Sequence, residues 1–217
     1  MICIEISLNG KLLWRAGLEN AVVLSSTLSS LLGPSQAPVQ LLAIGVCRLP
    51  DGRIANGHWG ESPPVNMGDV VRFTLVECDA PTPPTQLNAT DSPEFLQAQR
   101  LVEEFERNYV PPDAPVAQSW PGLAFRCSVN GVYRAMAIRK PQAEYLNCNL
   151  EWEARQPQQM HFHVNSGSAS RPGEEWEAVR FRTSLALGES LEVQLVAALA
   201  LVEAPEGGRS VLSGGGR

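Results

Sequence analysis

Two histidines separated by one residue, His161 and His163, are the side chains whose type and spacing best suit chemistry. They lie in the alternating run Met160–Val164, which predicts a β-strand with both imidazoles on one face. Such a pair could hold Zn²⁺ or Cu²⁺ if a neighbouring strand supplied a third ligand, with Cys148 or Glu151 as candidates. The competing interpretation is two histidines on a solvent-facing surface. A metal-dependent enzyme with its site at His161 and His163 is therefore kept as one hypothesis.

A second candidate is the pair His58 and Trp59, which sits in the glycine-flanked stretch Asn56–Gly60. An exposed Trp beside a His can anchor a ligand or a protein partner. The alternative is a Trp that closes the end of a β core and donates its N–H to a loop carbonyl. A small-ligand or carbohydrate-binding protein would use tryptophans as stacking platforms, and the candidates are Trp59, Trp14 and Trp176.

Other catalytic patterns find little support. The sequence has no G-x-S-x-G nucleophile motif, no P-loop and no dinucleotide-binding glycine pattern. The acidic pairs Glu103-Glu104 and Glu174-Glu175 are adjacent in the chain and sit in expected surface segments, which is unlike a catalytic carboxylate pair. We therefore expect no cofactor, and we favour a protein without enzymatic activity.

The charge balance restricts the partners. The chain has 17 basic and 23 acidic residues and a net charge of −6, whereas nucleic-acid binding usually needs a clustered basic surface. No apolar run reaches the roughly 18 residues of a membrane helix, since the longest, Val193–Val202, is shorter. The partner expected here is a protein, with a basic protein as the specific hypothesis, and neither nucleic acid nor membrane is expected.

Five cysteines form an odd set without a C-x-x-C pair: Cys3, Cys47, Cys78, Cys127 and Cys148. The N-terminal residues show no basic segment followed by an apolar one, as a signal peptide would. Both observations predict reduced thiols packed in a core and a cytoplasmic protein.

The chain also shows an internal similarity. Alternating residues run into an Asn-Gly pair at Asn9-Gly10 and again at Asn130-Gly131, and a second apolar segment follows each pair. Asn-Gly between such runs predicts a β-hairpin, because both residues tolerate positive φ. Similar segments recur in the same order about 120 residues apart, namely 21–28 with 143–150, 40–44 with 160–164, and 67–76 with 187–196. Unrelated alternation in two β regions is the competing explanation.

Between the similar parts lies a proline-rich stretch. Ser92-Pro93-Glu94 resembles a helix start, with Ser as N-cap and Pro at the first helical position. The apolar residues that follow recur at spacings of three and four and predict one amphipathic stripe, formed by Phe95, Ala98, Val102, Phe105 and Tyr109. This helix either clamps the two repeats together or serves as an exposed partner-binding element; for the second role the candidate residues are Phe95, Val102 and Phe105.

The sequence thus predicts a mainly β protein: a tandem repeat of two small, sandwich-like antiparallel β domains joined by a linker α-helix. The expected boundaries are repeat 1 at 1–79, the linker at 80–119 with a helix at about 92–109, repeat 2 at 120–204, and a flexible Gly-rich tail at 205–217. The function favoured is non-catalytic binding of a macromolecule, as an adaptor or as an inhibitor or antidote. Unpaired edge strands would make a homodimer plausible.

Overall fold

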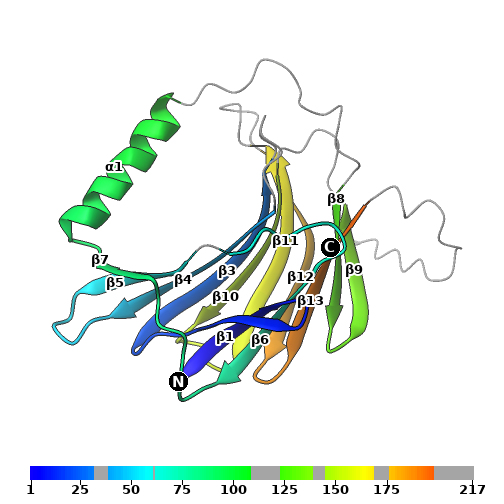
Figure 1. The fold of residues 1–217 in the computed structure, drawn as a ribbon, viewed down its shortest axis with the longest axis horizontal. Coiled ribbons are helices and arrows are strands. Elements are labelled where there is room, and N and C mark those ends of the chain that lie inside the picture. Colours follow the sequence, from blue (N-terminus) through cyan, green and yellow to red (C-terminus); the bar gives the residue numbers. More distant parts are fainter. Residues whose placement is uncertain (32–38, 61, 109–122, 139–144, 169–175, 198–217) are drawn as a thin grey trace, which may run out of the picture.

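The computed structural model describes residues 1–31, 39–60, 62–108, 123–138, 145–168 and 176–197. Within these ranges the chain forms thirteen strands and one helix, and the strands assemble into two sheets (Figure 1). All pairings between the named strands are antiparallel. The prediction of a mainly β, antiparallel fold is confirmed.

The smaller sheet has six strands, which in spatial order are β2 (Lys11–Ala16), β1 (Ile2–Leu8), β6 (Val70–Glu77), β13 (Ser190–Ala197), β8 (Leu123–Val129) and β9 (Val132–Ile138). The larger sheet has seven, in the order β12 (Trp176–Ala186), β11 (Gln159–Ser168), β10 (Tyr145–Glu153), β3 (Ala21–Leu31), β4 (Gln40–Arg48), β5 (Ile54–Trp59) and β7 (Gln86–Ala89).

The core lies between the two sheets and follows from the alternation of the strands. Alternate residues of the central strands are buried and mostly apolar, as in Val71, Phe73 and Leu75 of β6, although β3 also buries Ser26 and Ser30. The largest fully buried side chains come from both sheets and include Trp59, Phe73, Phe125 and Phe162. Sheet-on-sheet packing of this kind leaves each sheet with one outer face.

The strands of the first half (Ile2–Glu77, β1 to β6) and of the second half (Leu123–Ala197, β8 to β13) meet inside both sheets. β6 pairs with β13 in the smaller sheet, and β3 pairs with β10 in the larger one. Each half contributes three strands to each sheet, and β7 adds one more at the edge beside β5. The described strands of the two halves therefore share the same two sheets.

Both Asn-Gly pairs form the predicted hairpin turns. The φ angles are 51° and 78° at Asn9 and Gly10, and 51° and 74° at Asn130 and Gly131. Positive φ at both central residues is the property of a type I′ turn, whose twist matches that of the flanking strands. The turns connect β1 to β2 and β8 to β9.

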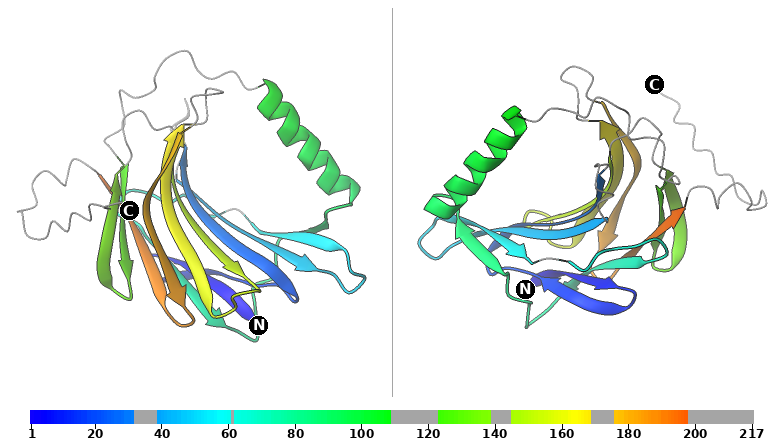
Figure 2. Two further views of the ribbon diagram at one scale, coloured as in Figure 1. Left: turned by 180° about the vertical axis from the view of Figure 1, so that it is seen from behind. Right: turned by 45° about the horizontal axis from the view of Figure 1, so that its top comes forward.

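The predicted helix is also present, as α1 (Pro93–Asn108), and it begins with the expected cap. The backbone N–H of Phe95 donates to Ser92 Oγ over 3.2 Å, and that of Leu96 donates to the Ser92 carbonyl over 3.0 Å. α1 contacts β7, the strand that precedes it, and stands away from the sheets (Figure 2). Among the described residues, no helix has the length and apolar character needed to cross a membrane.

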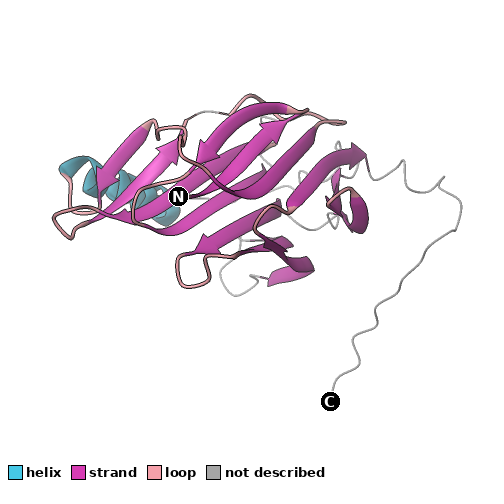
Figure 3. Cartoon of the chain, turned by 90° about the horizontal axis from the view of Figure 1, so that it is seen from below, coloured by secondary structure: helices cyan, strands magenta, loops and turns pink. Residues whose placement is uncertain are grey.

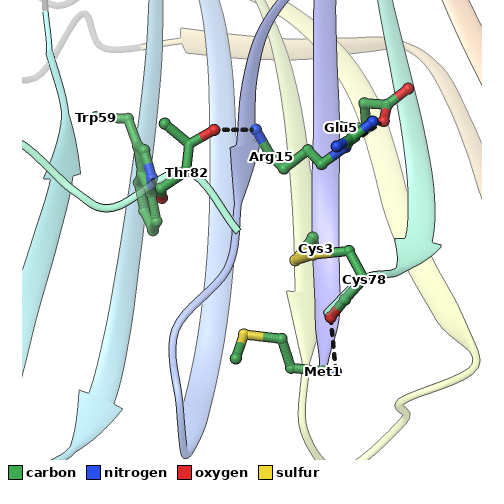
Figure 4. Close-up of a disulfide and its surroundings, with 7 residues drawn as sticks. All are labelled: Met1, Cys3, Glu5, Arg15, Trp59, Cys78 and Thr82. Atoms are coloured by element: carbon green, nitrogen blue, oxygen red, sulfur yellow. Dashed lines mark hydrogen bonds and ion pairs between the residues drawn. A yellow bond between two sulfur atoms is a disulfide. The ribbon is translucent and has the colours of Figure 1, made fainter. Parts of the chain in front are cut away.

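One cysteine prediction is wrong. Cys3 of β1 and Cys78, which directly follows β6, form a disulfide with their Cα atoms 6.4 Å apart (Figure 4). Antiparallel pairing places Cys3 opposite Val76, so that Cys78 lies within reach although it is 75 residues away in the chain. Disulfides persist mainly in oxidising compartments. Cys3 and Cys78 therefore do not support the prediction of a cytoplasmic location, which assumed reduced thiols.

The remaining thiols agree with the prediction of core packing. Cys47, Cys127 and Cys148 are free and buried. Burial raises the pKa of Cys127 to about 12 and raises the pKa of Cys148 and of Cys47 above the ordinary value. These thiols stay protonated near neutral pH and are poor nucleophiles.

Candidate functional site

The outer face of the seven-stranded sheet gathers most of the residues with functional chemistry. On β11, Met160, Phe162 and Val164 are buried in the core, so His161 and His163 share the outer face, as the alternation predicts. α1 stands on this side of the larger sheet, away from the smaller sheet (Figures 1 and 3). The two histidines and the helix therefore belong to one side of the molecule.

Both histidines are hydrogen-bonded within the sheet. His161 Nδ1 lies 3.1 Å from Ser184 Oγ of β12, and His161 Nε2 lies 3.1 Å from Gln156 Oε1. His163 Nε2 lies 3.4 Å from Asn149 Nδ2 of β10. Ser184, His161 and Gln156 form a chain, but an uncharged amide stands where a Ser–His–Asp triad has a carboxylate.

The two third ligands proposed for a metal differ in position. Cys148 is fully buried on the core face of β10 and cannot reach the outer face of β11. Glu151 is the residue directly opposite His161 across the two strands. Within the described ranges, no group of three or more His, Cys, Asp or Glu side chains is arranged to hold a metal ion. Metal binding at His161 and His163 stays a prediction.

A ladder of polar side chains crosses the middle of this outer face. Thr27 Oγ1 donates to Asn149 Oδ1 over 3.0 Å, and Ser29 Oγ donates to Asn147 Oδ1 over 2.8 Å. Asn149 Nδ2 in turn donates to Asn165 Oδ1 over 2.9 Å. The ladder joins β3, β10 and β11 and was missed from the sequence. The Ser/Thr and Asn residues at every second position were visible, but their adjacency depends on the pairing of β3 with β10.

Beside the polar ladder, β4 presents an exposed apolar stripe. Leu42 and Ile44 point outward with exposed fractions of 49% and 41%, next to Thr27 and Ser25 of β3. His58 lies opposite Ile44 on β5 and is exposed. This stripe was also missed, because the run Leu41-Leu-Ala-Ile44 is apolar on both faces of the strand and gives no sign of which residues face solvent.

Trp59 does not share this face with His58. It is 2% exposed, and its Nε1–H donates to the carbonyl of Thr82 over 2.7 Å (Figure 4). This is the alternative considered from the sequence, a Trp that closes the core and bonds a loop carbonyl. Trp14 is half-buried on β2, and the side chain of Trp176 lies outside the described residues.

Among the described side chains of α1, the large apolar residues Leu96 and Leu101 are exposed, at 40% and 59%. Of the residues predicted to bind a partner, Phe95 is half-buried, whereas the side chains of Val102 and Phe105 lie outside the described residues. The exposed leucines were not singled out from the sequence, since the stripe was drawn through the aromatic positions.

Searches of the chain against protein-family models, curated proteins and solved structures find no match. The function therefore has to be argued from this face of the sheet and from α1.

Proposed function

We propose that the protein is a non-catalytic binding protein that takes a protein partner on the outer face of the seven-stranded sheet, next to α1. The observation that carries the proposal is the stripe of Leu42 and Ile44. An outward face of a sheet is normally polar, so adjacent exposed aliphatic residues on a central region of it favour a buried contact with another molecule. The polar ladder beside them supplies hydrogen-bonding groups for the surrounding rim.

The position of α1 supports the same proposal. Its main contact is β7, the strand to which it is joined, and Leu96 and Leu101 are left exposed. A helix that clamped the two halves would bury such residues against both of them. The arrangement therefore favours a docking element over an internal clamp.

The charge of the chain favours a basic partner. With a net charge of −6, the protein would attract a basic protein over long range and speed their association. This supports the narrower proposal of an inhibitor or antidote that caps a basic protein, and it predicts an association rate that falls as salt is added.

We also propose that the two halves are copies of one β unit. The order β2-β1-β6 at one end of the smaller sheet matches β9-β8-β13 at the other, and β5-β4-β3 matches β12-β11-β10 in the larger one. The hydrogen bonds repeat as well: Gly68 N–H donates to the Leu195 carbonyl, and Gly188 N–H donates to the Leu75 carbonyl. A duplicated unit offers two related surfaces, which suits a binding protein.

The carbohydrate alternative has less support, because Trp59, one of its three proposed stacking platforms, is buried. Tryptophan fluorescence across a glycan panel tests it directly, and a shift specific to one glycan would restore it over protein binding.

The proposal is tested by Leu42→Lys/Ile44→Lys and by Leu96→Ser/Leu101→Ser. The matched control is Leu12→Lys/Met67→Lys, which changes residues of similar exposure, 42% and 43%, outside the stripe. Partners are captured from the native cell with each protein, identified by mass spectrometry, purified and measured by calorimetry. We expect both test variants to keep the wild-type melting temperature and to bind the same partner at least tenfold more weakly. The control should bind it with the wild-type affinity.

Equal affinity of all variants for that partner would refute the proposed surface. If only the Leu96/Leu101 variant unfolds, α1 is an internal clamp. The affinity of the Leu42/Ile44 variant would then be the remaining test of the binding site.

A further inference from the structure

A short segment of the chain joins the two sheets. This strap (residues 79–85) begins after the disulfide residue Cys78 and ends at β7, the strand that leads into α1. Within it, Thr82 N–H donates to the Arg15 carbonyl of β2 over 3.0 Å, and Arg15 N–H donates to Thr82 Oγ1 over 2.9 Å. The Trp59 indole of β5 donates to the Thr82 carbonyl over 2.7 Å (Figure 4). Thr82 therefore binds the strap to both sheets.

The beginning of the strap is fixed at two points. Three residues of the strap are prolines, which have no backbone N–H to donate. Among the described residues, Thr82 is the one member of the strap before its last residue that forms hydrogen bonds. The other fixed point is Cys78, through the disulfide to Cys3 and through hydrogen bonds with Met1. The covalent bond at this second point is one that a thiol can break.

The end of the strap is bonded to the sheet that carries the candidate site. Thr85 N–H donates to the His58 carbonyl over 2.8 Å, and Gly60 N–H donates to Thr85 Oγ1 over 2.9 Å. Directly after Thr85, β7 pairs with β5 at the edge of the larger sheet, and α1 contacts β7. Because α1 has its main contact at β7, its position beside the binding face depends on how firmly the strap is held.

We propose that the disulfide between Cys3 and Cys78 is a redox switch: its reduction by a dithiol loosens the strap and weakens binding at the neighbouring face of the larger sheet. The effect on binding rests on the function proposed above. All seven residues of the strap are exposed or half-buried, so the strap can leave β2 without removing side chains from the core. Reduction is therefore expected to open the structure locally and leave the two sheets packed.

The reduction proceeds by two thiol–disulfide exchanges. Cys78 is half-buried whereas Cys3 is fully buried, so the first thiolate of the dithiol attacks Cys78 Sγ. The S–S bond breaks, and Cys3 leaves as a thiolate that takes up a proton. The second thiol of the reductant then attacks its own sulfur in the mixed disulfide, which releases Cys78 as a thiol. Two electrons and two protons pass to the protein, and the dithiol becomes a disulfide.

The loosening of the strap is tested by hydrogen exchange of the tryptophan indoles, followed by NMR of the full chain before and after reduction with dithiothreitol. Trp59 reports on the strap through its bond to Thr82. Trp152 is the matched control, because it is 5% exposed and its indole donates to the Pro157 carbonyl over 3.0 Å, three strands away from β5. Trp59→Phe and Trp152→Phe assign the two signals.

We expect reduction to speed the exchange of the Trp59 indole at least tenfold and to leave that of Trp152 within twofold. Equal acceleration of both indoles would mean that the disulfide only adds to global stability, and this result would overturn the switch. An unchanged rate at Trp59 would overturn it as well.

The effect on binding is tested with Cys3→Ala/Cys78→Ala, which lacks the disulfide without any reductant. We expect this variant and the reduced wild type to bind the partner captured above about tenfold more weakly than the oxidised wild type. Dithiothreitol should leave the affinity of the variant unchanged. Equal affinity of the oxidised and reduced wild type would refute the control of binding. If the oxidised wild type binds no partner, the proposed function fails, and the indole exchange still decides whether the strap is released.

Discussion

The first and second halves of the molecule share the hydrogen bonds of their turns. They differ in a disulfide and in the contacts made at the edge of the smaller sheet. In each half, an Asn-Gly turn bonds to an acidic turn before the last strand: Asn9 Nδ2 donates to Asp69 Oδ1, and Asn130 Nδ2 donates to Glu189 Oε1. Among the described residues, only the first half has a disulfide and a segment that covers the edge strand, where Thr82 exchanges hydrogen bonds with Arg15 of β2. The turn contacts are thus common to both halves, whereas the crosslink and the covered edge at β2 belong to the first half.

The disulfide marks this difference most clearly. Cys3 pairs with Val76 across β1 and β6, and Ala124 occupies the same place opposite Val196 across β8 and β13. Gly17 lies against Cys3, and a Cβ at that position would overlap the sulfur. The first half is therefore built around the disulfide in a way that the described part of the second half is not.

Breaking the disulfide should have the largest effect. Cys3→Ala/Cys78→Ala removes a crosslink that spans 75 residues, which by loop entropy stabilises the folded state by about 4 kcal/mol. Urea unfolding measures the loss. Dithiothreitol should weaken the wild type to a similar extent and leave the variant unchanged, and a wild type insensitive to reductant would show that the crosslink contributes nothing.

Removing the turn asparagines should have equal effects in the two halves. Asn9→Ala and Asn130→Ala each lose two side-chain hydrogen bonds, from the side-chain amide to the acid and from the N–H of Val70 or Ser190 to the side-chain oxygen. Each should cost about 3 kcal/mol in urea unfolding, of which about 2 kcal/mol comes from the two hydrogen bonds and about 1 kcal/mol from positive φ at an alanine.

The control for this pair is Asn20→Ala, a residue with φ of 54°. It measures the cost of positive φ, about 1 kcal/mol, apart from the turn contacts. A twofold difference between the Asn9 and Asn130 variants in the loss of unfolding free energy would contradict the proposed equivalence of the halves.

The ion pair between Arg72 and Glu192 joins β6 to β13, where the halves meet, with Arg72 Nε 2.9 Å from Glu192 Oε1. Arg72 is more than half exposed, so a double-mutant cycle with alanine should give a coupling energy of about 0.2–1 kcal/mol. Added salt should reduce it. A coupling that persists in high salt would show that this junction is held by more than charge.

The smallest effect is expected from the pH response of Asp69. The side-chain hydrogen bond from Asn9, with a backbone hydrogen bond from Asn66, lowers the pKa of this carboxyl. A depressed pKa in the folded state adds stability above the unfolded value of about 3.9 and loses it as the pH falls through the folded value. Asp69→Asn should therefore differ from the wild type at pH 6 and approach it near pH 3 in urea unfolding; parallel pH curves would rule out this contribution.

The elements with local signals could be predicted from the sequence. Ser92 and Pro93 predict the start of α1, and the two Asn-Gly pairs predict their hairpins, because caps and tight turns depend on residues that are neighbours in the sequence. Trp59 also illustrates this, since its bond to a loop carbonyl was one of the two outcomes considered.

The candidate site could not be predicted in the same way. The polar ladder exists because β3 lies beside β10, and a strand's partner is chosen by packing over long sequence distances. The same holds for the disulfide, since the spacing of five cysteines does not show which two strands meet. The exposed Leu42 and Ile44 belong to a run that is apolar on both faces, and alternation alone cannot tell such a strand from one buried on both sides.

The pairing of β6 with β13 also determines when the smaller sheet can be completed during synthesis. About 110 residues separate these strands, so at about 5–20 residues per second the ribosome needs roughly 6–20 s to make the partner of β6. The inner edge of β3 has no partner until β10 (Tyr145–Glu153) is made, and the inner edge of β6 has none until β13 is made later still. Contacts of such long range also slow folding itself. The interval between synthesis of the two halves is when the protein is most exposed to aggregation, and a chaperone that binds strand edges would act then.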